Sequence, residues 1–100
     1  MSYNIIFAAE VYTDLQEAVD FYNSRKKGLG TRFFKTVKNQ ISFVKSNVFS
    51  FQVRYDDVRC IPLNIFPYTI HYRVLQETKT IAIIAVFCDY LDPKIWEDRI

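Results

Sequence analysis

Several residue types are scarce in this 100-residue sequence, which has 2 glycines, 3 prolines, 2 cysteines and 1 histidine. So few glycines and prolines, with a hydrophobic fraction of 50%, exclude a collagen-like chain, a flexible linker and a disordered tail. The longest apolar run, residues 81–88, is too short to cross a bilayer, and no signal segment is apparent. We therefore expect a single globular domain over residues 1–100, located in the cytoplasm and without a membrane partner.

The familiar catalytic motifs are also missing. A single histidine excludes a histidine-based metal cluster and a two-histidine acid–base pair. The glycines, Gly28 and Gly30, flank one residue and do not form a phosphate-binding loop, and no GxSxG elbow presents a serine. Cys60 and Cys88 form no CxxC pair and lie in apolar, strand-like runs, where a free cysteine is usually a small buried hydrophobe. The sequence predicts no cofactor and no bound metal.

Charge is unevenly distributed, although the net charge is only +2. Residues 1–24 contain four acidic and no basic side chains, whereas residues 25–59 contain nine basic and two acidic ones. Such a basic middle suits an acidic partner, but it is more typical of a solvated, lysine-rich helix face. The pI of about 8.6 is lower than that of a typical nucleic-acid-binding domain.

The first half of the chain predicts a short strand and two helices. Residues 3–8 are β-branched and aromatic, which favours a strand. Thr13 or Asp14 is expected to cap the first helix, with Asp14 and Glu17 as a capping box, and Gly28 to stop it in a left-handed conformation. The second helix is expected to end at Asn47. The apolar stripes of the two helices are Leu15, Ala18, Val19 and Tyr22, and Phe33, Phe34, Val37, Ile41 and Val44.

The second half predicts strands. Residues 51–55 and 58–63 are strand-like segments interrupted by a bend or bulge at Asp56-Asp57. Residues 68–75 alternate, and residues 80–88 are apolar on both faces, as in a central strand. Residues 94–99 form a short closing segment, in which Trp96 either docks onto the sheet or contacts a partner. The expected fold is α+β: an N-terminal strand, an antiparallel two-helix hairpin and a three-stranded antiparallel meander, with the helices on one face of the sheet.

One group of polar residues is a candidate site. Arg59, His71 and Arg73 lie on strands that we expect to be neighbours, and Asp89, Tyr90 and Asp92 follow the last strand. If the helix-free face of the sheet carries His71 and Arg73, that face is basic, and its arginines can pair with a phosphate or carboxylate. The alternative is an exposed face with ordinary polar residues, in which Arg59 pairs with an aspartate and steadies the bend.

These segments resemble a known family. Residues 66–74 (FPYTIHYRV), preceded by Val58-Arg59 and followed by residues 83–87 (IIAVF), are similar to the RelE/ParE superfamily of bacterial toxins, and residues 92–99 (DPKIWEDR) are similar to its plasmid stabilisation branch. The resemblance implies the toxin of a type II toxin–antitoxin pair, silenced by a cognate antitoxin. RelE-like members cleave messenger RNA in the ribosome with basic and tyrosine side chains of the open sheet face, and ParE-like members block DNA gyrase.

The resemblance has two departures. The branch commonly has histidine where this chain has Cys88, and arginine where it has Leu91. They favour a ParE-like, non-nucleolytic inhibitor or a decayed toxin over a RelE-like ribonuclease, whose candidate catalytic residues are Arg59, Arg73, Tyr90 and His71. The antitoxin is expected to lay a helix or a strand over an apolar groove beside the helical hairpin, and the chain to form a homodimer or a toxin–antitoxin hetero-oligomer.

Overall fold

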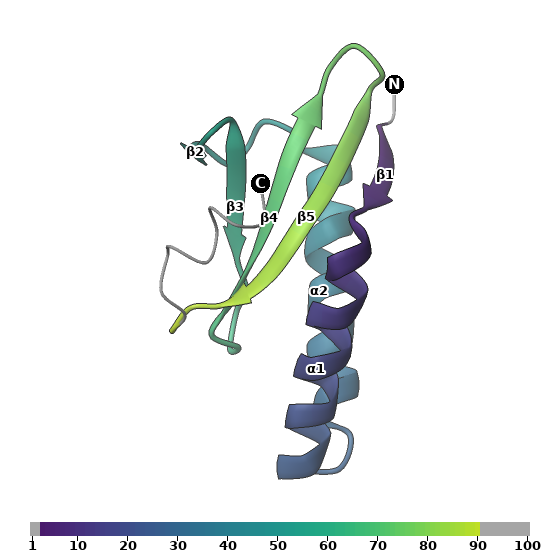
Figure 1. Cartoon of the computed structure of the whole chain (residues 1–100), viewed down its shortest axis with the longest axis vertical. Coiled ribbons are helices and arrows are strands. Elements are labelled where there is room, and N and C mark those ends of the chain that lie inside the picture. Colours follow the sequence, from purple (N-terminus) through teal and green to yellow (C-terminus); the bar gives the residue numbers. More distant parts are fainter. Residues whose placement is uncertain (1–2, 91–100) are drawn as a thin grey trace.

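The computed structural model describes residues 3–90. Residues 94–99, which the sequence predicts as a closing segment, Trp96, and the positions Leu91 and Asp92 lie outside the described residues. The elements in chain order are β1 (Asn4–Phe7), α1 (Ala9–Arg25), α2 (Leu29–Ser46), β2 (Val53–Tyr55), β3 (Val58–Pro62), β4 (Tyr68–Leu75) and β5 (Thr80–Cys88) (Figure 1).

The sheet has five strands in the order β1-β5-β4-β3-β2, and β1 runs parallel to β5 while all other pairs are antiparallel. The predicted three-stranded meander is therefore wrong in detail, because the segment before β4 is two strands. Asp56 and Asp57 both have positive φ, at 41° and 59°, and connect β2 to β3 as a two-residue turn. Two-residue hairpins favour this conformation because it matches the twist of the strands, so the expected bend is a hairpin.

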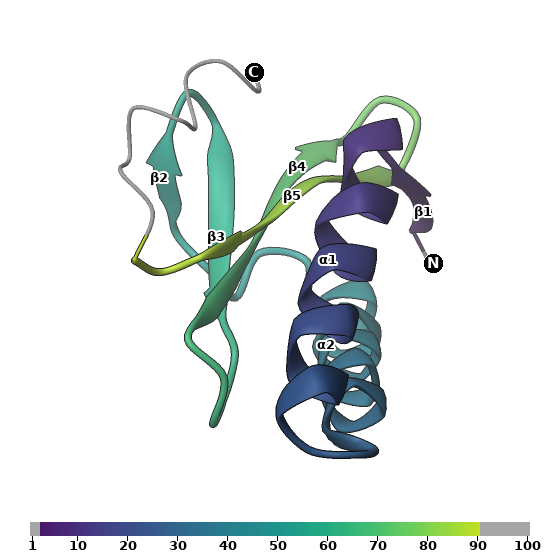
Figure 2. The same cartoon turned by 60° about the horizontal axis from the view of Figure 1, so that its bottom comes forward.

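The two helices form an antiparallel hairpin that covers one face of the sheet, as the sequence predicts (Figure 2). Their buried residues and those of β3, β4 and β5 form one core. Phe34 departs from the expected stripe, since it is 41% exposed while Phe33 is completely buried. Successive helical residues point about 100° apart, so two adjacent phenylalanines cannot both face the sheet. The buried helical side chains are Val11, Ala18, Phe33, Val37, Ile41 and Val44.

The start of α1 differs from the prediction, because the helix begins at Ala9, before the expected capping box. The backbone N–H of Ala8 donates to Ile83 O at 2.9 Å, so the chain turns into the helix as soon as it leaves the sheet. Asp14 thus lies inside the helix, and its Oδ2 accepts a hydrogen bond from the N–H of Val86 at 3.1 Å. β1 pairs only with residues 80–83 of β5, so it does not reach Val86. The Asp14 carboxylate therefore accepts a backbone N–H of β5 that β1 leaves without a strand partner.

The other end of α1 agrees with the prediction only in part. Gly28 has the expected left-handed conformation, with a φ of +86°, but it is the N-cap of α2, because α1 already ends at Arg25 with Lys26 as its C-cap. Within residues 3–90, neither helix is long and apolar enough to cross a membrane.

The two helices approach each other closely at Gly30. Its N–H donates to Asn23 Oδ1 at 2.8 Å. A Cβ atom at Gly30 would meet the carbonyl oxygen of Val19 and lie 2.7 Å from Asn23 Cγ. Only glycine therefore allows α2 to lie against α1 at this distance.

Replacing Gly30 by alanine is expected to lower the free energy of unfolding by about 1–3 kcal/mol, because the helices must move apart. Urea denaturation of the purified chain measures this change. Gly28→Ala is the matched control: a Cβ there meets nothing within 4 Å, and only the positive φ is unfavourable, at about 1 kcal/mol. A larger loss in Gly28→Ala than in Gly30→Ala would contradict the close-approach argument.

Candidate functional site

The alternation predicted for β4 is confirmed, with Ile70 and Tyr72 in the core beneath the helices. His71 and Arg73 therefore point to the helix-free face. His71, however, is completely buried, whereas the sequence led us to expect an exposed polar face. Its Nδ1 is 2.8 Å from the hydroxyl oxygen of Tyr55 and 3.5 Å from Cys60 Sγ, and its ring packs edge-on against Phe87. His71 is thus part of a hydrogen-bonded cluster inside the protein.

Arg59 lies on the other face of the sheet. It is the register partner of Tyr72, and partners in an antiparallel pair share a face. The Nη1 of Arg59 donates to Phe51 O at 2.6 Å, and the guanidinium lies 5.2 Å from the ring centroid of Phe49. Arg59 therefore fastens the segment between α2 and β2 to the sheet.

Arg73 forms the ion pair that the sequence suggested for Arg59. Its Nε lies 2.9 Å from Asp57 Oδ1, in the turn between β2 and β3. The side chain of Asp57 is 76% exposed, so solvent screens this pair. An arginine therefore does pair with an aspartate of this turn, but it is Arg73 on β4 and not Arg59 on β3.

Tyr90 lies just beyond β5 and is 85% exposed. Asp89 beside it accepts a hydrogen bond from Thr69 Oγ1 at 2.6 Å. Cys88, the last residue of β5, pairs with Tyr68 at the start of β4. Tyr68 is five residues from Arg73 on the same strand, so this end of the sheet lies roughly 16 Å from Arg73. Within residues 3–90, the structure brings His71 and Arg73 to one face, and places Arg59 on the opposite face and Tyr90 at the far end of the sheet.

Burial also determines the protonation of the groups near this sheet. It raises the pKa of Tyr68 to about 12 and also raises the pKa of Tyr72 and of the Cys60 thiol. All three groups therefore keep their protons at neutral pH and do not supply a base or a thiolate there. Within residues 3–90, no three His, Cys, Asp or Glu side chains are grouped so as to hold a metal ion.

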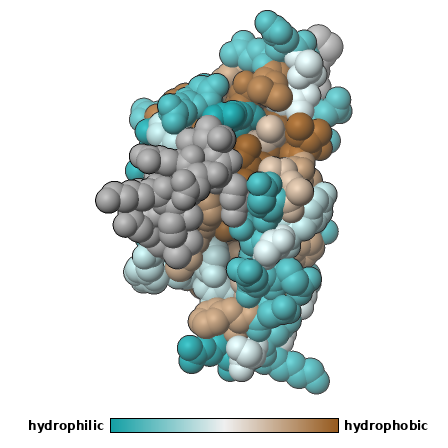
Figure 3. All heavy atoms as spheres, in the orientation of Figure 1, coloured by the Kyte–Doolittle hydropathy of each residue, from teal (hydrophilic) through white to brown (hydrophobic). Residues whose placement is uncertain are grey.

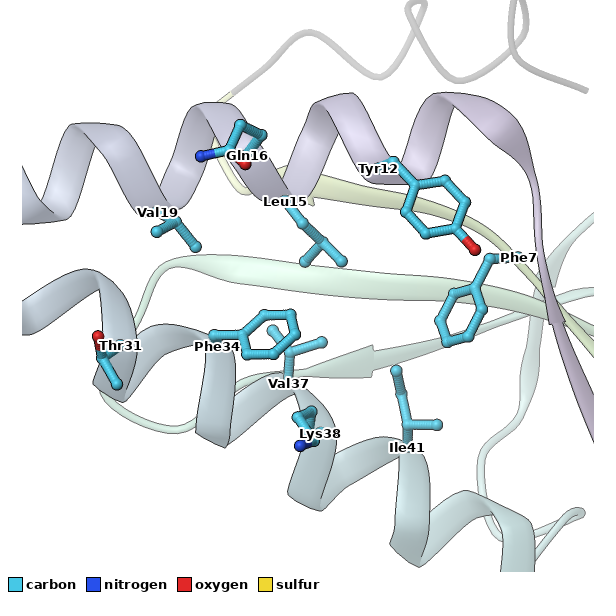
Figure 4. A pocket seen from close by; sticks show the side chains of 10 residues that line it. All are labelled: Phe7, Tyr12, Leu15, Gln16, Val19, Thr31, Phe34, Val37, Lys38 and Ile41. Atoms are coloured by element: carbon cyan, nitrogen blue, oxygen red, sulfur yellow. The ribbon is translucent and has the colours of Figure 1, made fainter.

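A concave surface lies on the helices. A groove of about 520 Å³ opens between α1 and α2 and reaches the end of β1 (Figure 4). Phe7, Tyr12 and Phe34 line it and are 37%, 63% and 41% exposed. Its remaining lining residues are Leu15, Gln16, Val19, Thr31, Val37, Lys38 and Ile41.

The groove is apolar and continues toward an open sheet edge. In the orientation of Figure 1, hydrophobic side chains gather over β1 and the neighbouring end of the sheet, while α1 below is mostly hydrophilic (Figure 3). Ile6 on β1 is 51% exposed. Exposed apolar surface of this kind is typical of a site that another chain covers. An apolar groove is therefore present, but it lies between the two helices of the hairpin, whereas we expected it beside the hairpin.

Sequence reasoning identified the groove only in outline. The second stripe of α1, formed by Tyr12, Leu15 and Val19, has the spacing i, i+3, i+7 and was available as a signal. The contribution of Phe7 depends on where β1 ends relative to α1, which periodicity does not show.

No protein-family model matches the sequence, and no curated protein matches it. Several solved structures, however, are similar to this chain. A chain of the chromosomal ParDE TA system from P. aeruginosa has 17% identity and a TM-score of 0.73, covering 84% of this chain and 92% of that chain. An E. coli RelE toxin mutant in the free state has 17% identity and a TM-score of 0.74, covering 99% and 95%.

A third similar structure is the E. coli RelE mutant in complex with an antitoxin RelBc peptide, at 19% identity, a TM-score of 0.59 and coverage of 100% and 96%. These similarities extend over most of each chain and agree in the arrangement of helices and strands. The chain therefore has the fold of the RelE/ParE toxins, as its sequence resemblance implies.

Proposed function

We propose that this chain is the toxin of a type II toxin–antitoxin system, acting in the bacterial cytoplasm and silenced by a cognate antitoxin. The likeness to RelE and to the ParDE system over most of the chain supports this proposal. The apolar groove between α1 and α2 supplies a surface for the antitoxin, as the helix-in-groove mode of recognition requires. Plasmid stabilisation is the role that the sequence resemblance implies.

Within this class, we favour a ParE-like toxin that inhibits a cellular target such as DNA gyrase without cutting nucleic acid. The supporting observation is the dispersal of the candidate catalytic residues within the described chain. Arg59 and Arg73 face opposite sides of the sheet, and His71 is buried. Phosphoryl-transfer chemistry needs its charged groups to converge on one phosphate, and these three do not.

Tightly controlled induction in a bacterial host tests the proposal. We expect growth arrest with intact RNA and altered plasmid supercoiling, and rescue by co-expression of the adjacent antitoxin reading frame. The Phe33→Asp chain, which cannot bury its core side chain, is the control for expression burden.

Two other outcomes are informative. Arrest with translation-dependent RNA cleavage would favour the RelE-like ribonuclease, with Arg59, Arg73, Tyr90 and His71 as its candidate residues. Absence of arrest, with soluble folded protein confirmed, would contradict the toxin proposal and indicate a decayed toxin.

A further inference from the structure

We propose that the partner helix in the groove carries acidic side chains along one flank, which pair with the lysines of α2. This inference rests on the proposed toxin–antitoxin function and specifies the chemistry of the antitoxin segment.

The walls of the groove favour a helix over a strand as occupant. Both walls are helices, whose backbone hydrogen bonds are made within each helix, so they offer no backbone partners to the N–H and C=O groups of an inserted strand. The apolar wall of α2 runs from Phe34 to Ile41, a length of about 10 Å. A helix presents side chains at i, i+3 or i+4 and i+7 over the same length.

The α2 helix, which forms one wall of the groove, is basic. From Leu29 to Ser46 this helix contains four basic residues and no acidic one. Lys38 lines the groove, with its Nζ 5.7 Å from the ring centroid of Phe34. Lys35 and Lys45 lie three residues before and seven after Lys38, which places them on the same side of α2.

These lysines have no carboxylate partner within the described chain. Between residues 3 and 90, the Arg73–Asp57 pair is the single ion pair, and it lies on the sheet. Three uncompensated positive charges beside an exposed apolar groove match an apolar helix with acidic residues on its flank.

The opposite wall, formed by α1, does not favour acidic side chains of a partner. On α1, Gln16 lines the groove and donates to Asp20 Oδ1 at 2.8 Å, so this rim is neutral to acidic. A partner with acids on both flanks would meet repulsion from Asp20. Because a helix has a fixed hand, the flank that carries the acids also determines the direction in which the partner lies in the groove.

Two designed amphipathic peptides test the inference. Both have the same leucine stripe, one with glutamates along one flank and the other with lysines at the same positions. Fluorescence anisotropy with the purified full chain gives their affinities. We expect the glutamate peptide to bind about tenfold more tightly, and the difference to shrink in about 0.5 M salt, which screens rim charges.

A matched pair of charge reversals locates the effect. Lys38→Glu is expected to weaken the glutamate peptide about fivefold and to strengthen the lysine peptide. Arg32→Glu makes the same change on the same helix, six residues before Lys38 and away from the groove, and is expected to alter binding less than twofold. Circular dichroism confirms that both variants are folded.

Several results would overturn the inference. Equal affinity of the two peptides, or equal effects of Lys38→Glu and Arg32→Glu, would show that the α2 lysines do not select the partner. Failure of both peptides to bind would exclude a helix in the groove, as would a stable dimer in sedimentation that the peptides do not dissociate. Growth arrest on induction is measured without any peptide, so the toxin proposal stands or falls separately.

Discussion

Replacing Phe33 by alanine is expected to lower the free energy of unfolding by about 3–5 kcal/mol. Phe33 is completely buried where α2 meets the sheet. Its ring centroid lies 5.4 Å from Tyr22, 5.3 Å from Phe66 and 4.9 Å from Tyr68, so one side chain connects both helices to β4 and its preceding loop. Truncation removes this apolar surface from the core and leaves a cavity that three rigid rings cannot easily fill.

Urea denaturation followed by circular dichroism measures this loss, and Phe34→Ala is its matched control. Phe34 is the next residue of the same helix and lines the groove, where it is 41% exposed. We expect Phe34→Ala to cost less than about 1 kcal/mol of stability but to weaken the binding of both groove peptides. Similar losses of stability in the two variants would contradict the assignment of Phe33 to the core and Phe34 to the groove.

Periodicity was sufficient to predict the helical hairpin and most of its core. Val37, Ile41 and Val44 repeat at the spacing of one helical face, and all three are buried. The start of α1 could not be predicted in the same way. Asp14 has the sequence signature of a cap, but its carboxylate accepts the N–H of Val86, 72 residues away. Side-chain hydrogen bonds to distant strands leave no local trace in the sequence.

The arrangement of the candidate site residues Arg59, His71 and Arg73 could not be predicted, for a different reason. Whether Arg59 shares a face with Arg73 depends on the register between β3 and β4, and a shift of one residue moves a side chain to the other face. The structure pairs Arg59 with Tyr72, which directs the arginine toward the helices. Alternation along β4 predicts that His71 and Arg73 share a face, but it does not show that Tyr55 and Cys60 enclose His71.

Replacing Arg59 by alanine is expected to lower the free energy of unfolding by about 2 kcal/mol, because the carbonyl of Phe51 loses a charged hydrogen-bond donor. Arg73→Ala is the matched control. It removes one ion pair with a largely exposed aspartate, so we expect a loss within about 1 kcal/mol. Urea denaturation of the two variants measures both values. Equal losses would show that the contacts of Arg59 with the segment after α2 add nothing to stability.

This structural role changes how an Arg59 variant must be interpreted in a toxicity or RNA-cleavage assay. Phe49→Ala removes the ring 5.2 Å from the guanidinium and leaves the charge of Arg59 in place. For an arginine that acts only by holding this segment, activity should fall with stability to a similar extent in Arg59→Ala and Phe49→Ala. RNA cleavage lost in Arg59→Ala but retained in a Phe49→Ala chain that is equally folded would instead assign the guanidinium to catalysis. That result would favour the RelE-like ribonuclease over the ParE-like inhibitor.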